Sequence, residues 1–390
     1  MKIQIPQHII GITLVAVGPL TFTATAHSAT VWDNIAKAQA SIKSLHVQWK
    51  RELIAAPAPS TNPEKEEAFA AQSLIRQGWS TPDAKQTAAA IKLSATDRLL
   101  GYKQRADLEI VAFPPVVRAV ITDYPRIVNG QPNQTSNTPI GRTLDYFDGI
   151  NALYADDIDT NAIGMLTRDG EVFSRTFGKT GVDIFLINTP ITRFFKPQDT
   201  TVSDTAQGLI LEKKQIFSER RFLTWRLILS KEDYRPLSLT KMTPKGKVVE
   251  RITATNYRMH EAGISFPDKV QVDNGAQRFN YTLVTAEFNE RVDPQSVRLP
   301  AKLRVVDGRF GTEGAQSVEY PLANGKLPSD ESVKKMLGQK GDRVQPKEAR
   351  QYSQGEQSTV PVVAGLGLLL VAIGGGMWRR GERQQPSDRS

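Results

Sequence analysis

The chain of 390 residues contains no cysteine and only four histidines. The absence of cysteine excludes thiol catalysis, disulfide bonds and cysteine-ligated metals, and it also excludes the acylated cysteine of a bacterial lipoprotein. His8 and His27 lie in or beside a predicted export signal, which leaves His46 and His260. Two separated histidines are too few for a histidine metal cluster, so we expect neither a metal nor a cofactor.

Sequence motifs of the common catalytic classes are also missing. The stretch Phe177-Gly178-Lys179-Thr180 lacks the first glycine of a phosphate-binding loop, because Phe173 stands at that position. The chain has no nucleophile elbow and no zinc-protease helix motif. The acidic run from Asp156 to Asp159 lacks the glycine and the glutamate of a calcium loop. We expect a protein that is not an enzyme, although the plentiful carboxylates leave a carboxylate-pair hydrolase open.

Charge of one sign is in modest excess, with a net charge of +9 and a pI near 9.5. A basic protein could bind a polyanion, but here lysine and arginine are spread along the chain and stand beside acids. Examples are Glu212-Lys213-Lys214 and Arg51-Glu52. This pattern is typical of a solvated basic surface, so we expect no nucleic-acid partner.

The two ends of the chain are the least polar parts. Lys2, an apolar run and the small residues Ala24-Thr25-Ala26 predict a signal peptide over residues 1–26, with an uncleaved anchor as the alternative. Residues 359–378 carry no charge and precede Arg379-Arg380, which predicts a transmembrane helix and a cytoplasmic tail over residues 379–390. Residues 339–358 are polar and are expected to be a flexible linker. The main domain, residues 27–338, should then be exported and anchored in the cytoplasmic membrane.

Alternating apolar residues dominate the stretch from Gly208 to Pro300. Leu223, Trp225, Leu227 and Leu229 occupy every second position, as expected of a half-buried strand. Similar runs occur at residues 209–217, 236–242, 247–257, 264–272 and 278–288, and the turn Asn274-Gly275 suits a tight hairpin. Six short-linked strands predict one antiparallel meander that is curved by its own twist.

The first part of the domain changes its period from 3.6 to 2 at Leu45, which predicts a helix that runs directly into a strand. Two helical patterns follow, and we expect them to form an inserted arm or lid at about residues 55–108. Residues 143–154 are a hairpin candidate. The apolar run at residues 182–187 is either a buried strand or the start of a short helix.

The order of these elements resembles the periplasmic lipoprotein-carrier family, the LolA/LolB-like proteins. The resemblance is carried by residues 35–45, Tyr146-Phe147-Asp148-Gly149, Asp233-Tyr234-Arg235-Pro236-Leu237 and Phe266-Pro267-Asp268. It implies an α+β fold in which a curved antiparallel sheet, an incomplete β-barrel, carries helices over its concave face. It also implies an apolar cavity that shields a lipid or the acyl chains of a lipoprotein.

The predicted function is therefore that of a membrane-tethered extracytoplasmic binding protein, in lipoprotein sorting or envelope sensing. The alternative is a non-catalytic envelope sensor or structural surface protein with a filled core and no lipid ligand. The oligomeric state stays open. Nine residues have the strand parity expected of the cavity lining: Val47, Trp49, Leu223, Trp225, Leu227, Leu229, Phe279, Tyr281 and Leu283.

Overall fold

The structure is a computed structural model that describes residues 21–76, 80–129, 137–156, 158–159, 163–167, 181–218, 221–260, 263–301, 303–309 and 317–339. The α-helices in this part are α1 (Thr21–Ala40), α2 (Pro63–Arg76), α3 (Thr81–Leu100), α4 (Asp183–Leu186) and α5 (Asp330–Gln339). No helix within these ranges is both long and apolar enough to cross a membrane. Residues 340–358 of the predicted linker, the predicted span and the predicted tail lie outside the described residues, as do residues 1–20 of the predicted signal peptide, whereas Gln339 ends α5.

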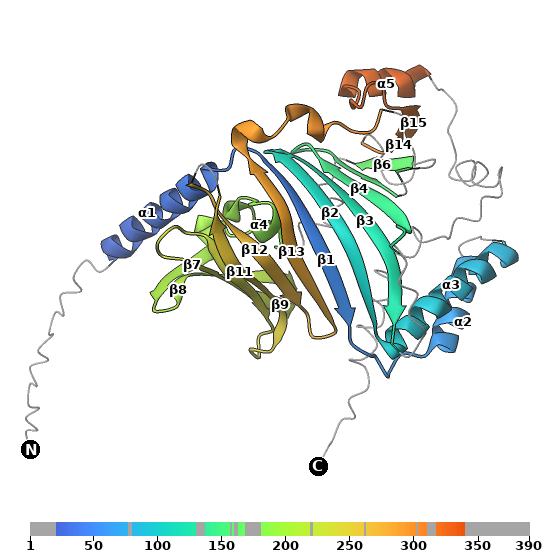
Figure 1. The fold of residues 1–390 in the computed structure, drawn as a ribbon, viewed down its shortest axis with the longest axis horizontal. Coiled ribbons are helices and arrows are strands. Elements are labelled where there is room, and N and C mark those ends of the chain that lie inside the picture. Colours follow the sequence, from blue (N-terminus) through green and yellow to red (C-terminus); the bar gives the residue numbers. More distant parts are fainter. Residues whose placement is uncertain are drawn as a thin grey trace, which may run out of the picture.

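The described strands form one large sheet of 15 strands in the order β15-β14-β6-β5-β4-β3-β2-β1-β13-β12-β11-β10-β9-β8-β7. All neighbours are antiparallel except β14 and β6. The edge strands β7 and β15 are not paired with each other, so the curved sheet stays open like an incomplete barrel (Figure 1). The strands are β1 (Leu45–Ala55), β2 (Tyr102–Phe113), β3 (Val116–Val128), β4 (Gly141–Phe147), β5 (Ala152–Ala155), β6 (Ile163–Thr167), β7 (Thr200–Thr205), β8 (Gly208–Ser218), β9 (Arg221–Leu229), β10 (Pro236–Met242), β11 (Val248–Met259), β12 (Ser265–Asp273), β13 (Gln277–Phe288), β14 (Arg304–Asp307) and β15 (Val318–Pro321).

The predicted meander is confirmed, because β8 to β13 follow one another in both sequence and space. The predicted helix-to-strand junction is also present, although α1 begins earlier than expected and ends at Ala40. Strand β1 then pairs with β13 on one side and β2 on the other, which joins the start of the chain to the meander. The hairpin predicted at residues 143–154 is formed by β4 and β5.

The helical insertion is shorter than predicted and does not cover the sheet. Residues 102–108 belong to β2, and the α2–α3 hairpin lies beyond one end of the sheet, beside β3 (Figure 1). Its helices share a small apolar cluster formed by Ala70, Ala88 and Ile91. Phe69 and Leu100, two large apolar residues of these helices, are 55% and 38% exposed. The two helices bury apolar surface mainly against each other, so the lid prediction is wrong for this segment.

Two apolar cores lie on opposite faces of the sheet. The first, which we call the inner core, is covered by α1 and by residues 181–195, which include α4. The second, the outer core, is covered by residues 299–301 and 322–337, the latter including α5. Strand β3 contributes to both, because Ala119 and Ile121 point into the inner core and Val120 points into the outer core. Side chains alternate along a strand, so strands β3 to β5 contribute side chains to both cores.

Candidate functional site

The predicted lining residues lie together on the inner face of the sheet. Leu223 and Phe279 are partly buried and pack against the inner core. The other seven are at most 9% exposed and belong to that core: Val47, Trp49, Trp225, Leu227, Leu229, Tyr281 and Leu283. The strand parity read from the sequence therefore placed them on one face, whereas their role in ligand binding stays a prediction.

The chain itself fills the space in front of these side chains. Phe185 and Leu186 of α4 are 1% and 0% exposed. The ring of Phe194 stacks on Trp225, with a centroid distance of 6.2 Å and an interplanar angle of 21°, and Phe195 meets Trp225 edge-on. Residues 181–195, which we call the plug, occupy the position at which the sequence analysis placed a cargo.

Helix α1 holds the plug through one polar side chain. The Gln39 amide nitrogen donates to the Thr189 carbonyl oxygen at 3.1 Å, and its amide oxygen accepts from the Ile191 backbone N–H at 2.9 Å. The Asn188 side chain donates in turn to the Gln39 carbonyl oxygen at 3.2 Å. These bonds replace the regular backbone pairing that the plug lacks over residues 188–190. The plug and α1 are thus one connected cover.

The inner face also carries charged side chains that the sequence analysis did not single out. Lys241 is 7% exposed and forms an ion pair with Glu250, its neighbour on β11, at 2.7 Å between Nζ and Oε1. Burial lowers the pKa of Lys241, and the carboxylates of Glu250 and Asp183 oppose that shift. Asp183 comes from the plug and is fully buried. Lys241 stands two residues after Leu239 on β10 and therefore points to the same face of the sheet. This spacing is the sequence feature that could have identified Lys241 as an inward lysine.

A second lysine lies one strand beyond Trp225. Lys213 on β8 donates a hydrogen bond to the Phe194 carbonyl oxygen of the plug. Burial lowers the pKa of Lys213, while nearby Asp199 raises it and Lys196 lowers it. In register, Lys213, Trp225 and Lys241 are consecutive across β8, β9 and β10. The Nζ atom of Lys213 lies 5.3 Å from the centroid of the Trp225 ring, and the Nζ atom of Lys241 lies 4.3 Å from it.

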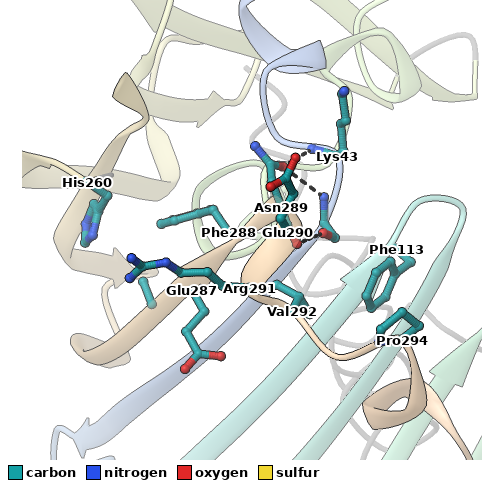
Figure 2. A pocket seen from close by; sticks show the side chains of 12 residues that line it. Lys43, Phe113, His260, Glu287, Phe288, Asn289, Glu290, Arg291, Val292 and Pro294 are labelled. Atoms are coloured by element: carbon teal, nitrogen blue, oxygen red, sulfur yellow. Dashed lines mark hydrogen bonds between the residues drawn. The ribbon is translucent and has the colours of Figure 1, made fainter. Parts of the chain in front are cut away.

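An open cleft of about 900 Å³ lies at the end of the sheet where β1 begins and β13 ends (Figure 2). Its lining mixes Lys43, Glu287 and Arg291 with the rings of Phe113 and His260 on opposite sides. Asn289 secures this end, because its side-chain oxygen accepts from the Lys43 backbone N–H at 2.7 Å. None of the predicted lining residues belongs to this cleft.

His260 is the titratable side chain of this cleft whose ring packs against two phenylalanines. Its centroid lies 6.4 Å from Phe266 and 5.3 Å from Phe288, with edge-on geometry in both pairs. Burial and the charge of Arg258 lower the pKa of His260, with a smaller opposing effect of Asp268. Within the described residues no group of three or more histidines and carboxylates is placed to hold a metal ion.

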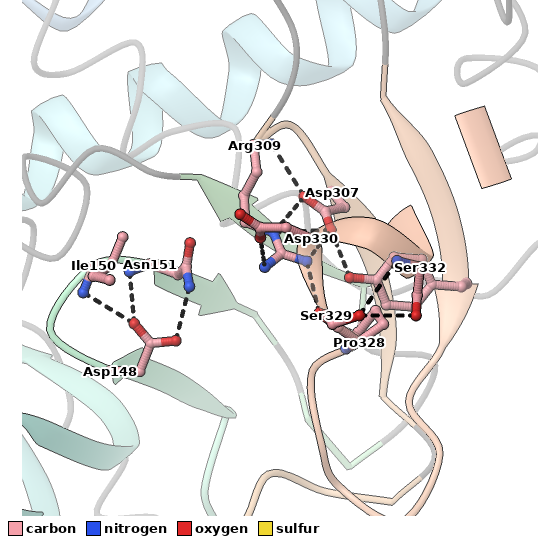
Figure 3. A network of polar contacts seen from close by, with 10 residues as sticks. Asp148, Ile150, Asn151, Asp307, Arg309, Pro328, Ser329, Asp330 and Ser332 are labelled. Carbon is pink, nitrogen blue, oxygen red and sulfur yellow. Dashed lines mark hydrogen bonds and ion pairs between the residues drawn. The ribbon is translucent and has the colours of Figure 1, made fainter. Parts of the chain in front are cut away.

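A polar network in the outer core joins the last strands to α5 (Figure 3). The Asp307 carboxylate accepts from Arg309 Nη2 at 2.8 Å and from the Tyr320 hydroxyl at 2.7 Å. Arg309 also donates to the Pro328 carbonyl oxygen and to Asp330 on α5. These residues lie on β14, on β15, on α5 and in the segments between them, so we assign this network to the stability of the outer core.

No family model matches the chain, and no curated protein matches it. Several solved structures, however, are similar to this chain. A domain described as an outer membrane lipoprotein-sorting protein from Vibrio parahaemolyticus has 10% identity and a TM-score of 0.35, covering 69% of this chain and 97% of that chain. A DUF1329 family protein from Desulfovibrio piger has 5% identity and a TM-score of 0.37, covering 70% and 97%.

A LolA superfamily protein from Nitrosomonas europaea has 8% identity and a TM-score of 0.32, covering 67% of this chain and 95% of that chain. The chain is thus similar to LolA-type structures, as the sequence analysis expected. At this level of identity the likeness concerns the fold alone. What the protein binds has to be argued from its own side chains.

Proposed function

We propose that the protein is a non-catalytic binding protein that takes up an acyl chain on the inner face of its sheet. The observation that carries this proposal is the continuous apolar surface that runs over β8 to β13 and on to β1 and β2. This surface is covered by a short, mostly irregular plug and by α1, rather than by a second sheet. Residues 359–378 would tether the protein to the cytoplasmic membrane, with the main domain outside the cytoplasm.

An acyl chain can replace apolar contacts that the plug makes with the sheet. An isolated helix of four residues is unstable in water, so α4 depends on its contacts with the sheet. Transfer of an acyl chain from water contributes about 0.8 kcal/mol for each buried methylene. A long chain therefore offers the inner face as much apolar burial as the plug side chains Phe185, Phe194 and Phe195 provide. The plug would leave with α1, to which Gln39 binds it.

Brominated stearate tests this function, because bromine quenches tryptophan fluorescence only at short range. The chain has five tryptophans, of which Trp32, Trp49 and Trp225 are buried in the inner core. Replacement of Trp79 and Trp378 by phenylalanine leaves these three as reporters. We expect the full-length protein in nanodiscs to show quenching that saturates with added brominated stearate. The matched control is unbrominated stearate, which should leave the intensity unchanged.

The second candidate is a sensor or structural protein with a permanently filled core. The observation that favours it is the complete burial of Phe185, Leu186 and Phe195 beneath the sheet. It predicts no quenching of the three core tryptophans by brominated stearate. It also predicts that organic extraction of the purified protein releases no more lipid than the nanodisc alone supplies. Both results together would reject the lipid-binding proposal.

A further inference from the structure

The inner face has a polar centre whose composition narrows the class of ligand. Lys213 and Lys241 flank Trp225 on adjacent strands, and both side chains lie beneath the plug. The plug places Asp183 near Lys241 and the Phe194 carbonyl oxygen on Lys213. It thereby presents a carboxylate, a carbonyl oxygen and aromatic carbon to this one spot. A fatty acid or another single-chain amphiphile with an anionic head group presents the same chemistry.

Charge balance at this centre indicates the charge of the head group. Lys213 and Lys241 supply two positive charges, Glu250 and Asp183 supply two negative charges, and the neighbouring ion pair of Arg51 with Asp123 is neutral overall. Asp199 and Lys196, the further charges that act on Lys213, oppose each other in sign. If the plug leaves, Asp183 leaves with it and one positive charge remains uncompensated on the sheet. One negative charge on a ligand would restore neutrality in this apolar surrounding.

Lys241 is incompletely solvated in this core, because it is 7% exposed and its burial lowers its pKa. Replacing a buried ion pair by apolar residues of similar volume is often neutral or stabilising, because the pair has lost its hydration. We infer that Lys241 and Lys213 bind the anionic head group of a single-chain amphiphile, with the acyl chain along Trp225 and the apolar inner face. In the closed state described here, Asp183 and the Phe194 carbonyl oxygen take the place of that head group. This inference rests on the proposed function and adds the head-group charge to it.

The test compares a photoactivatable diazirine fatty acid with its methyl ester, using the full-length protein in nanodiscs. The two probes share one acyl chain and differ only in head-group charge. We expect the acid to label peptides of the inner face at a concentration about tenfold lower than the ester, as for a charge-assisted hydrogen bond. Lys241→Met should remove this preference. Lys269→Met, on the exposed outward side of β12, is the matched control and should retain it.

A second variant, Asp183→Asn, tests the competition between the plug and the ligand without loss of either lysine. It removes the internal carboxylate, so the acid should bind about tenfold more tightly while the ester is affected less. Equal labelling by acid and ester in the wild-type protein, with no change in either variant, would overturn the inference and leave the proposed function intact. Absence of inner-face labelling by both probes would instead overturn the proposed function.

Discussion

The two cores of this sheet use buried charge in different ways. In the outer core, Asp307 and Arg309 have side chains that are 0% and 3% exposed, and each makes several hydrogen bonds to neighbouring elements. In the inner core, Lys241 has a lowered pKa because burial exceeds the stabilisation by its carboxylates. The partners of the first pair lie on β15, on α5 and in the segment before α5, whereas one partner of Lys241 belongs to the plug.

This difference separates a fixed structural network from a replaceable one. A buried charge with a full set of hydrogen bonds ties its neighbours together and stabilises one arrangement. A buried charge that is only partly compensated gains from another partner of opposite sign. The outer core is therefore expected to resist perturbation as a unit, and the inner core is expected to exchange its cover.

The largest effect is expected from Asp307→Ala. This change leaves the Arg309 guanidinium buried without its main anionic partner, which typically costs about 3–5 kcal/mol of unfolding free energy. Urea unfolding followed by circular dichroism measures the loss. Asp204→Ala is the control, because the ion pair of Asp204 with Lys231 is about half exposed and should contribute about 0–1 kcal/mol. Equal effects of the two changes would remove the basis of the comparison.

The sequence predicted the elements of the meander better than it predicted what lies against them. Alternation identified β9, and the turn at Asn274-Gly275 fixed the register of β12 and β13. The same parity placed Trp49 and Trp225 on one face. It could not show that this face is filled, because the apolar run at residues 182–187 has no period that distinguishes a plug from a strand.

Two other features were beyond a local analysis of the sequence. The parallel pairing of β14 with β6 joins residues far apart in the chain, and no local pattern specifies it. Strand β3 contributes side chains to both cores. Its apolar residues occupy consecutive positions, such as Ala119 and Val120, so the sequence does not show which core each of them joins. The charged centre at Lys241 was missed because lysine is rarely buried, so its inward parity was not used.

Removal of Lys241 alone should destabilise the inner core by about 3 kcal/mol, because it leaves the carboxylates of Glu250 and Asp183 without this cation. The combined change Lys241→Met, Glu250→Gln and Asp183→Asn should recover the wild-type unfolding free energy to within about 1 kcal/mol. Urea unfolding of both variants checks this expectation. If the triple variant stays as unstable as the single one, the charges are structural, as in the outer core.

The pH dependence of stability should report Lys241 directly. Burial lowers its pKa in the folded protein, so between that value and the ordinary value of 10.5 the unfolded chain binds more protons than the folded one. The contribution of Lys241 to the free energy of unfolding therefore rises with pH between its lowered pKa and 10.5. Raised tyrosine pKa values act in the opposite direction above about pH 10, but they are shared by the wild type and the variant.

The measurement is the difference in unfolding free energy between the wild type and Lys241→Met, taken at several pH values from neutral to about pH 10. This difference should increase as the pH rises. Lys269→Met, which removes an exposed lysine of β12, is the matched control. A wild-type advantage that decreases with pH would mean that Lys241 is stabilised, rather than destabilised, in its charged form.

The smallest effect is expected from removing the α2–α3 hairpin, which belongs to neither core. Ala55 and Tyr102 are paired across β1 and β2, so an Asn-Gly turn in place of residues 56–101 should close these strands directly. The loss is limited to contacts such as the bond of Arg126 with Asp97, which suggests a change of about 1–2 kcal/mol. Quenching by brominated stearate should be retained, because the plug and α1 form the cover of the inner face. Loss of quenching in a folded deletion variant would instead make the hairpin part of the binding site, as the sequence analysis first proposed.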